Sequence, residues 1–172
     1  MKTIIPYKGK SPRFDQSVFI ADGVRMTGDV EIGPNSSIWY NTVIRGDVNH
    51  VRIGTNTNIQ DNATLHVSYD STPLIIGDNV TVGHNAILHS CVVGNNVLIG
   101  MGAIVLDNAI VENFSMIAAG ALVRPHSKIE TGKLYGGIPA KFIRDLTQEE
   151  LDYFQKSADN YAMYAAEYKK AT

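Results

Sequence analysis

The chain has 172 residues, with 15 Lys and Arg against 17 Asp and Glu, which gives a formal net charge of -2. This length suits one domain with its own buried core, and the charge balance excludes a strongly basic nucleic-acid binder. A single Cys excludes an intrachain disulfide framework and favours a reducing, cytoplasmic setting. The first ten residues hold no long apolar run, and the most apolar stretch, 87–106, is interrupted by polar residues and glycines. We therefore expect neither a signal peptide nor a membrane helix.

A six-residue period runs from residue 20 to residue 123. Large apolar residues occupy the repeated position, with three interruptions of the register, at Ile20, Met26, Ile32, Ile38, Ile44, Ile53, Ile59, Leu65, Ile76, Val82, Leu88, Val93, Ile99, Val105, Val111, Ile117 and Val123. A period of six matches neither an α-helical turn nor the alternation of a β-hairpin, and it is typical of a parallel β-helix. We therefore predict a single all-β domain with a β-helix over residues 18–125, rather than a β-sandwich with accidental spacing.

A helix is predicted at the end of the chain, over residues 147–170. Thr147 and Glu150 have the spacing of a capping box, in which each side chain bonds to the backbone N–H of the other residue. An apolar stripe with three- and four-residue spacing follows, at Leu151, Phe154, Ala158, Tyr161, Ala165 and Tyr168. A helix of about 22 residues measures about 33 Å, which is long enough to pack along the whole β-helical prism.

Three of the five histidines fall into the register of the repeat. His66 and His89 each follow a repeated apolar residue by one position, three faces apart, so we expect them to stack about 4.8 Å apart in successive coils. Two imidazoles at that distance can bind one metal ion. His84 belongs to the neighbouring face, so we expect it to complete the His66–His89 pair of another chain in a threefold assembly. The remaining histidines, His50 and His126, are interpreted as structural.

Three neutral imidazoles with one open position are typical of a catalytic zinc site, and Fe(II) or Co(II) would also accept these ligands. The register places four polar residues near the histidines, namely Gln60, Arg45, Asp47 and Asp61. Arg45 stacks one coil below His66, and Asp61 stacks one coil below His84. Gln60 is best placed to hydrogen-bond a metal-bound water. The charged residues either orient the ligands or seal a subunit interface with ion pairs.

These residues resemble a known family. The triplets Arg45–Asp47 (R-G-D) and Gln60–Asn62 (Q-D-N), together with the three histidines, are similar to those of γ-class carbonic anhydrases, and most similar to the short bacterial members. The resemblance runs from Ile20 through the final helix and includes the segment Tyr135–Lys141. It implies a left-handed β-helix that forms a homotrimer with three metal sites between subunits.

The implied activity is the reversible hydration of CO2 to bicarbonate by a metal-bound hydroxide, since zinc lowers the pKa of its water to about 7. The resemblance also implies that Gln60 contacts this hydroxide and that His84 comes from the neighbouring chain. Arg45, Asp47 and Asp61 would form pairs between subunits near the metal. CO2 or bicarbonate is thus the expected small-molecule partner, and neither nucleic acid nor a membrane is expected as a partner.

The chain departs from the family pattern after its first metal-ligating histidine. The best characterised member has an acidic loop there, with a Glu that carries the proton to solvent. The corresponding insertion, Val67–Pro73, holds Asp70 as its single carboxylate and no Glu. This difference puts rapid proton export in question, and Tyr69 and Asp70 are the available substitutes.

Two other functions stay open. A hexapeptide acyltransferase would use coenzyme A, a single His as general base and no metal, and fold alone does not separate it from a carbonic anhydrase. A catalytically silent, metal-stabilised trimer would instead serve as an assembly subunit. Cys91 is interpreted as a buried thiol rather than as a redox-sensitive neighbour of the metal. The sequence assigns no role to Trp39 or Tyr135, although either residue could line the site.

Overall fold

The computed structural model describes residues 3–171 of the chain. Within these residues twenty short strands precede one long helix, α1 (Gln148–Ala171). The strands are β1 (Ile4–Ile5), β2 (Arg13–Phe14), β3 (Phe19–Ile20), β4 (Arg25–Ile32), β5 (Ser37–Ile38), β6 (Val43–Ile53), β7 (Asn58–Ile59), β8 (Thr64–His66), β9 (Leu74–Ile76), β10 (Thr81–Val82), β11 (Ile87–His89), β12 (Val92–Val93), β13 (Leu98–Ile99), β14 (Ile104–Val105), β15 (Ile110–Val111), β16 (Met116–Ile117), β17 (Leu122–Val123), β18 (Lys128–Ile129), β19 (Lys133–Gly136) and β20 (Lys141–Asp145). Most strands are very short because each hexapeptide supplies one extended face followed by a turn.

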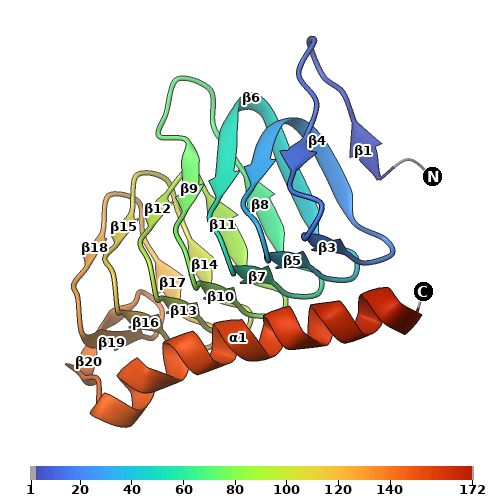
Figure 1. Ribbon diagram of the computed structural model, residues 1–172. Coiled ribbons are helices and arrows are strands. Elements are labelled where there is room, and N and C mark those ends of the chain that lie inside the picture. Colours follow the sequence, from blue (N-terminus) through green and yellow to red (C-terminus); the bar gives the residue numbers. More distant parts are fainter. Residues whose placement is uncertain (1–2, 172) are drawn as a thin grey trace.

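The strands stack into ladders that form the faces of a prism of about seven turns (Figure 1). One face carries β3, β5, β7, β10, β13, β16 and β19, and β20 closes its end with the one antiparallel pairing among the described strands. The other two faces belong to one 12-stranded sheet, because β4 and β6 run through the corner between them. The expected parallel β-helix is therefore confirmed. Its assembly into a trimer, which needs further chains, stays an expectation.

The repeated apolar residues fill the centre of the prism. In one ladder the successive Cα partners are Met26, Ile44, Leu65, Leu88, Val105 and Val123. Their side chains are at most 1% exposed, so each coil adds one inward-facing layer to the core. The ladders also continue past residue 125, through Ile129 in β18 and Tyr135 in β19. An aromatic residue takes the aliphatic position there, which weakens the periodic signal.

Asparagine is frequent in the turns because many of them require a positive φ. Turn residues with φ between 51° and 61° include Asn35, Asn41, Asn56, Asn62, Asn79, Asn85, Asn96 and Asn108. Asn adopts this left-handed conformation more readily than most residues other than glycine. The turns also bond to one another, since Asn56 Nδ2 donates to Asn79 Oδ1 at 3.0 Å.

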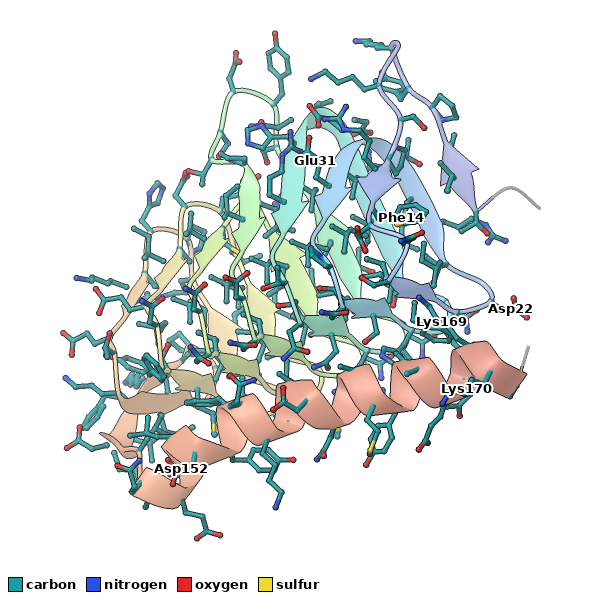
Figure 2. All side chains as sticks on the ribbon, in the orientation of Figure 1. Phe14, Asp22, Glu31, Asp152, Lys169 and Lys170 are labelled. Carbon is teal, nitrogen blue, oxygen red and sulfur yellow. The ribbon has the colours of Figure 1, made fainter. Side chains whose placement is uncertain are left out.

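Helix α1 lies along the face formed by β3, β5, β7 and β10 (Figure 1). Thr147 Oγ1 accepts from the Glu150 N–H at 3.3 Å, and Glu150 Oε2 accepts from the Thr147 N–H at 2.9 Å, which is the expected capping box. Phe154, a residue of α1, is buried. Figure 2 shows Lys169 towards the other end of α1, where its Nζ donates to the Ser17 carbonyl oxygen at 2.6 Å. Within residues 3–171, α1 included, no helix is both long and apolar enough to span a membrane.

Candidate metal site

His66 and His89 end two neighbouring strands, β8 and β11. Their Cα atoms are partners in the parallel ladder, because Leu65 and Leu88 occupy the same inward-facing position one coil apart. The ring centroids lie 5.0 Å apart, and His66 Nδ1 is 3.0 Å from His89 Nε2. The structure thus brings together two of the three histidines that the sequence predicts as metal ligands.

A carboxylate holds the other nitrogen of each ring. His66 Nε2 lies 3.3 Å from Asp47 Oδ1, and His89 Nδ1 lies 2.6 Å from Asp107 Oδ1. An ionised carboxylate only accepts hydrogen bonds, so each neutral ring directs its N–H to the aspartate and its lone pair to the other ring. Two facing lone pairs repel each other unless a cation or a proton lies between them.

This donor set fits a divalent transition metal. Two nitrogens bound at 2.0–2.1 Å to a tetrahedral ion lie about 3.3 Å apart, close to the 3.0 Å between His66 Nδ1 and His89 Nε2. Metal-ligating imidazoles commonly donate their second N–H to a carboxylate, which fixes the tautomer and the orientation of the ring. Asp47 is the carboxylate placed in this way for His66, and Asp107 is the one for His89.

Burial of His66 and the positive charge of Arg45 favour the neutral imidazole, which is the form that binds metals. Burial, together with the positive charge of Arg45, lowers the pKa of His66 below its usual value. Burial raises the pKa of Asp47, but hydrogen bonds from Arg45 and His66 outweigh this and lower it overall. Arg45 and Asp47 form an ion pair within one chain. At neutral pH this cluster therefore presents a carboxylate and a neutral imidazole.

Asp107 is a residue of this cluster that the sequence reasoning misses. Ser68 Oγ, from the insertion after β8, donates to Asp107 Oδ2 at 2.7 Å. Burial raises the pKa of Asp107, but hydrogen bonds from His89 and Ser68 lower it overall. The register contains the signal that would have found this residue. Asp107 follows Val105, the coil partner of Leu88, by two positions.

His84 belongs to a second cluster, in the turn between β10 and β11. Its Nδ1 lies 2.7 Å from Asp61 Oδ2, so its Nε2 is not used by this carboxylate. Gln60, next to Asp61, is 4% exposed, and its Nε2 donates to Asn58 Oδ1 at 3.1 Å. Gln60 Oε1 is buried and has no hydrogen-bond partner among the described residues. This cluster offers a third imidazole and an unused acceptor.

The two clusters stand on different ladders. His66 and His89 end strands of the 12-stranded sheet, whereas Gln60 and His84 follow strands of the 8-stranded sheet. Among the described residues of one chain, no group of three His, Cys, Asp or Glu side chains is arranged to hold a metal ion. Within the described part of one chain, the three histidines therefore do not form a single site. The threefold assembly that would bring His84 of one chain to the His66–His89 pair of another is predicted from the register, and it stays a prediction.

The remaining candidate residues take other places. Burial raises the pKa of the Cys91 thiol to about 12, so it stays protonated at neutral pH. Trp39 packs edge-on against Tyr161 of α1, with ring centroids 5.6 Å apart. Tyr135 packs against Phe142 where β19 meets β20. Trp39 therefore belongs to the contact with the helix, and Tyr135 to the closed end of the prism.

The insertion after β8 protrudes from the prism at the top of Figure 1. Tyr69 is 74% exposed on it and lines a surface hollow together with Asp47 and His50. Asp70 has a φ of 50°, in the turn of the insertion. Of the two proposed proton carriers, Tyr69 is thus the one that shares a hollow with a residue of the histidine cluster.

Comparisons with known proteins point to one family. A family model described as bacterial transferase hexapeptide (six repeats) matches residues 90–125. A Geobacillus kaustophilus protein named carbonic anhydrase is 51% identical, over 96% of this chain and 91% of its own length. An Arabidopsis thaliana protein named gamma carbonic anhydrase 2, mitochondrial, is 47% identical over 93% of this chain. The chain spans 59% of that plant protein's length.

A solved structure of similar sequence carries a different name. The crystal structure of a Bacillus cereus protein described as a putative acetyltransferase is 48% identical to this chain, with a TM-score of 0.96 over 98% of both chains. About half of the aligned residues are therefore shared with proteins named for two different activities, and the fold is shared with the solved one of them. Choosing between these activities depends on the chemistry of the site.

Proposed function

The chain belongs to the γ-carbonic anhydrase family of hexapeptide-repeat proteins, and we propose that it hydrates CO2 reversibly to bicarbonate at metal sites between the subunits of a homotrimer. One observation carries the proposal. His66 Nδ1 and His89 Nε2 approach to 3.0 Å, and an aspartate holds the opposite side of each ring. The 51% identity to a bacterial protein named carbonic anhydrase supports CO2 as the substrate.

In this proposal His66 and His89 of one chain and His84 of its neighbour hold the metal. Zinc is the first candidate, and Fe(II) or Co(II) would suit the same three imidazoles. A divalent ion bound there would act as a Lewis acid and lower the pKa of a coordinated water to about 7. Asp47 and Asp61 would keep the imidazoles in the tautomer that presents a lone pair.

Gln60 would orient the reacting water by accepting a hydrogen bond from it. Its amide nitrogen is already committed to Asn58, so its oxygen is the atom left to interact. A water that donates to this oxygen keeps a lone pair available for attack on the carbon of CO2. Arg45, held by Asp47, places a positive charge beside His66. That charge would favour the anionic product, bicarbonate.

Acetyl transfer is the second candidate, because the Bacillus cereus relative is described as a putative acetyltransferase. That reaction would need coenzyme A and no metal. A catalytically silent trimer is the third, in which the metal only joins the subunits. A cytoplasmic location also stays a proposal, since the Arabidopsis relative is named as a mitochondrial protein.

Metal content and CO2 hydration, measured on one anaerobically purified sample, test the proposal. We expect about three metal ions per trimer, with hydration lost in His84→Ala and kept in the control His126→Asn. Asn suits the φ of 60° at that control position. Metal without hydration would support the silent trimer. Metal-free protein that transfers acetyl groups from acetyl-coenzyme A would overturn the proposal.

Asp107→Asn is expected to weaken metal binding by about 10- to 100-fold. An amide can donate as well as accept, so it no longer forces the proton onto His89 Nδ1. Competition with a chelator measures the metal dissociation constant. Asp22→Asn, which alters an exposed aspartate, is the control and should leave that constant unchanged. Equal metal affinity in Asp107→Asn and the wild type would contradict the role of Asp107.

A further inference from the structure

The surface hollow that contains Tyr69 has a volume of about 370 Å³. Strand β6 lines it with five consecutive residues, from Gly46 to His50. The turn between β1 and β2 and the insertion between β8 and β9 form its rims, on either side of β6 in Figure 1. Because a water molecule occupies about 30 Å³ in the liquid, the hollow has room for several of them.

Asp47 belongs both to this hollow and to the histidine cluster. Its Oδ1 lies 3.3 Å from His66 Nε2, and the residue also lines the hollow. His50 follows three residues later on the same strand, and three extended residues span at most about 11 Å. Water molecules about 2.8 Å apart bridge such a distance in about four steps. The hollow is therefore a short path, open to water, from the candidate metal site to His50.

The ring of His50 differs from those of the three candidate metal ligands. The rings of His66, His84 and His89 each meet an aspartate, at 3.3, 2.7 and 2.6 Å. The backbone N–H of His50 donates to Asn49 Oδ1, but neither ring nitrogen bonds to another residue in the described part of the chain. A ring held by a carboxylate keeps one tautomer, whereas a ring without such a partner exchanges protons with water.

Four charged groups that pair with one another lie around His50. Asp29 meets Lys10 at 2.6 Å and Arg52 at 2.8 Å, and Arg52 also meets Glu31, labelled in Figure 2, at 3.3 Å. Burial and the positive charges of Arg52 and Lys10 lower the pKa of His50 below its usual value, although Asp29 and Glu31 act in the opposite direction. At neutral pH the imidazole is therefore mostly neutral and able to accept a proton.

The other titratable residues that line the hollow are Tyr7, Lys8, Lys10, Asp29, Asp47 and Tyr69. Imidazole is the one side-chain type in the hollow whose ordinary pKa lies between about 5 and 8. Burial raises the pKa of Asp29 and of Asp47, but hydrogen bonds from neighbouring side chains outweigh it and lower both. These carboxylates stay ionised at neutral pH, so His50 is the group in the hollow suited to gain and lose a proton there.

His50 also stands where β6 passes from one face of the prism to the next. Arg45 pairs with His66 in β8, whereas Val51, which follows His50, pairs with Leu74 in β9. The face of β9, β12, β15 and β18 carries none of the three candidate ligands, and α1 lies on a different ladder. A buffer molecule can therefore reach His50 from this side without entering the subunit interface that the proposed function requires.

We propose that His50 carries the proton released by CO2 hydration from the candidate metal site to solvent. This inference rests on the proposed function. Each turnover converts CO2 and one water molecule into bicarbonate and one proton. Water in the hollow passes that proton to the unprotonated ring nitrogen of His50. The imidazolium then gives a proton to buffer, which restores the neutral ring. His50, rather than Tyr69 or Asp70, is thus the proton carrier of this chain.

Stopped-flow CO2 hydration by the metal-loaded protein in dilute buffer tests this role. We expect kcat to fall about tenfold or more in His50→Gln, because glutamine cannot take up the proton. The ratio kcat/KM, which excludes the later release of the proton, should stay unchanged. In His50→Ala, added imidazole should restore kcat by replacing the missing base. His126→Asn, which removes an exposed histidine outside the hollow, is the control and should keep both constants.

NMR of the metal-free protein gives a readout that does not depend on turnover. Imidazole spectra recorded against pH should show His50 titrating with a midpoint below that of an ordinary histidine, and His50→Gln identifies its signal. A ring that does not titrate between about pH 5 and pH 8, or an unchanged kcat in His50→Gln, would overturn the inference. Wild-type protein that binds metal without hydrating CO2 would overturn the proposed function itself, so the two failures are distinguishable.

Discussion

A mixture of two metal-deficient variants is expected to recover about a quarter of the wild-type metal content and CO2 hydration. His84→Ala keeps the His66–His89 pair, and the double variant His66→Ala/His89→Ala keeps His84. In a cyclic trimer each interface joins the pair of one chain to His84 of the next. Every mixed trimer then has one intact interface of three, and random mixing makes about three quarters of the trimers mixed.

The physical basis of this result is the separation of the two clusters within one chain. His66 and His89 meet at 3.0 Å, but His84 bonds to Asp61 on another ladder. Each variant, denatured and refolded without the other, is the control and should stay nearly free of metal. Native mass spectrometry of the mixture confirms the number of chains. Metal restored in neither the mixture nor the controls would contradict a site shared between subunits.

The sequence predicts the prism well because one residue of each hexapeptide must point inward. Burial of residues such as Leu65 and Leu88 sets the register of every coil, and the register in turn places His66 beside His89. Residues at the same position of successive repeats are therefore predictable neighbours. This reasoning also works for Arg45, which pairs with His66 in the ladder.

Other features of the site depend on contacts that the repeat does not encode. Asp107 reaches His89 from the coil above, and Ser68 reaches Asp107 from an insertion outside the repeat. From the sequence, Gly83 and Gly100 are ordinary turn glycines. The structure shows why a side chain is excluded there, since a Cβ atom on Gly100 would lie 2.4 Å from the backbone nitrogen of Ala119 in the next coil.

Gly28→Ala is expected to lower the free energy of unfolding by about 3 kcal/mol or more. Gly28 has a φ of 77°, and a methyl group there would lie 2.3 Å from the carbonyl oxygen of Gly46. The two glycines are Cα partners where the pairing of β4 with β6 shifts register. The left-handed backbone accounts for about 1–2 kcal/mol of the loss. The rest comes from overlap with a backbone atom that the ladder holds in place.

Gly132→Ala is the matched control, because Gly132 has a φ of 73° and no atom within 4 Å of an added methyl group. Chemical denaturation at one protein concentration should show the smaller loss for this variant. Gly46 lies between Arg45 and Asp47, so strain at Gly28 should also displace the carboxylate that bonds to His66 and weaken metal binding. Equal losses of stability in the two variants would show that the corner yields to a methyl group. Close packing of β4 against β6 would then not explain why glycine occupies position 46, the middle of the R-G-D triplet.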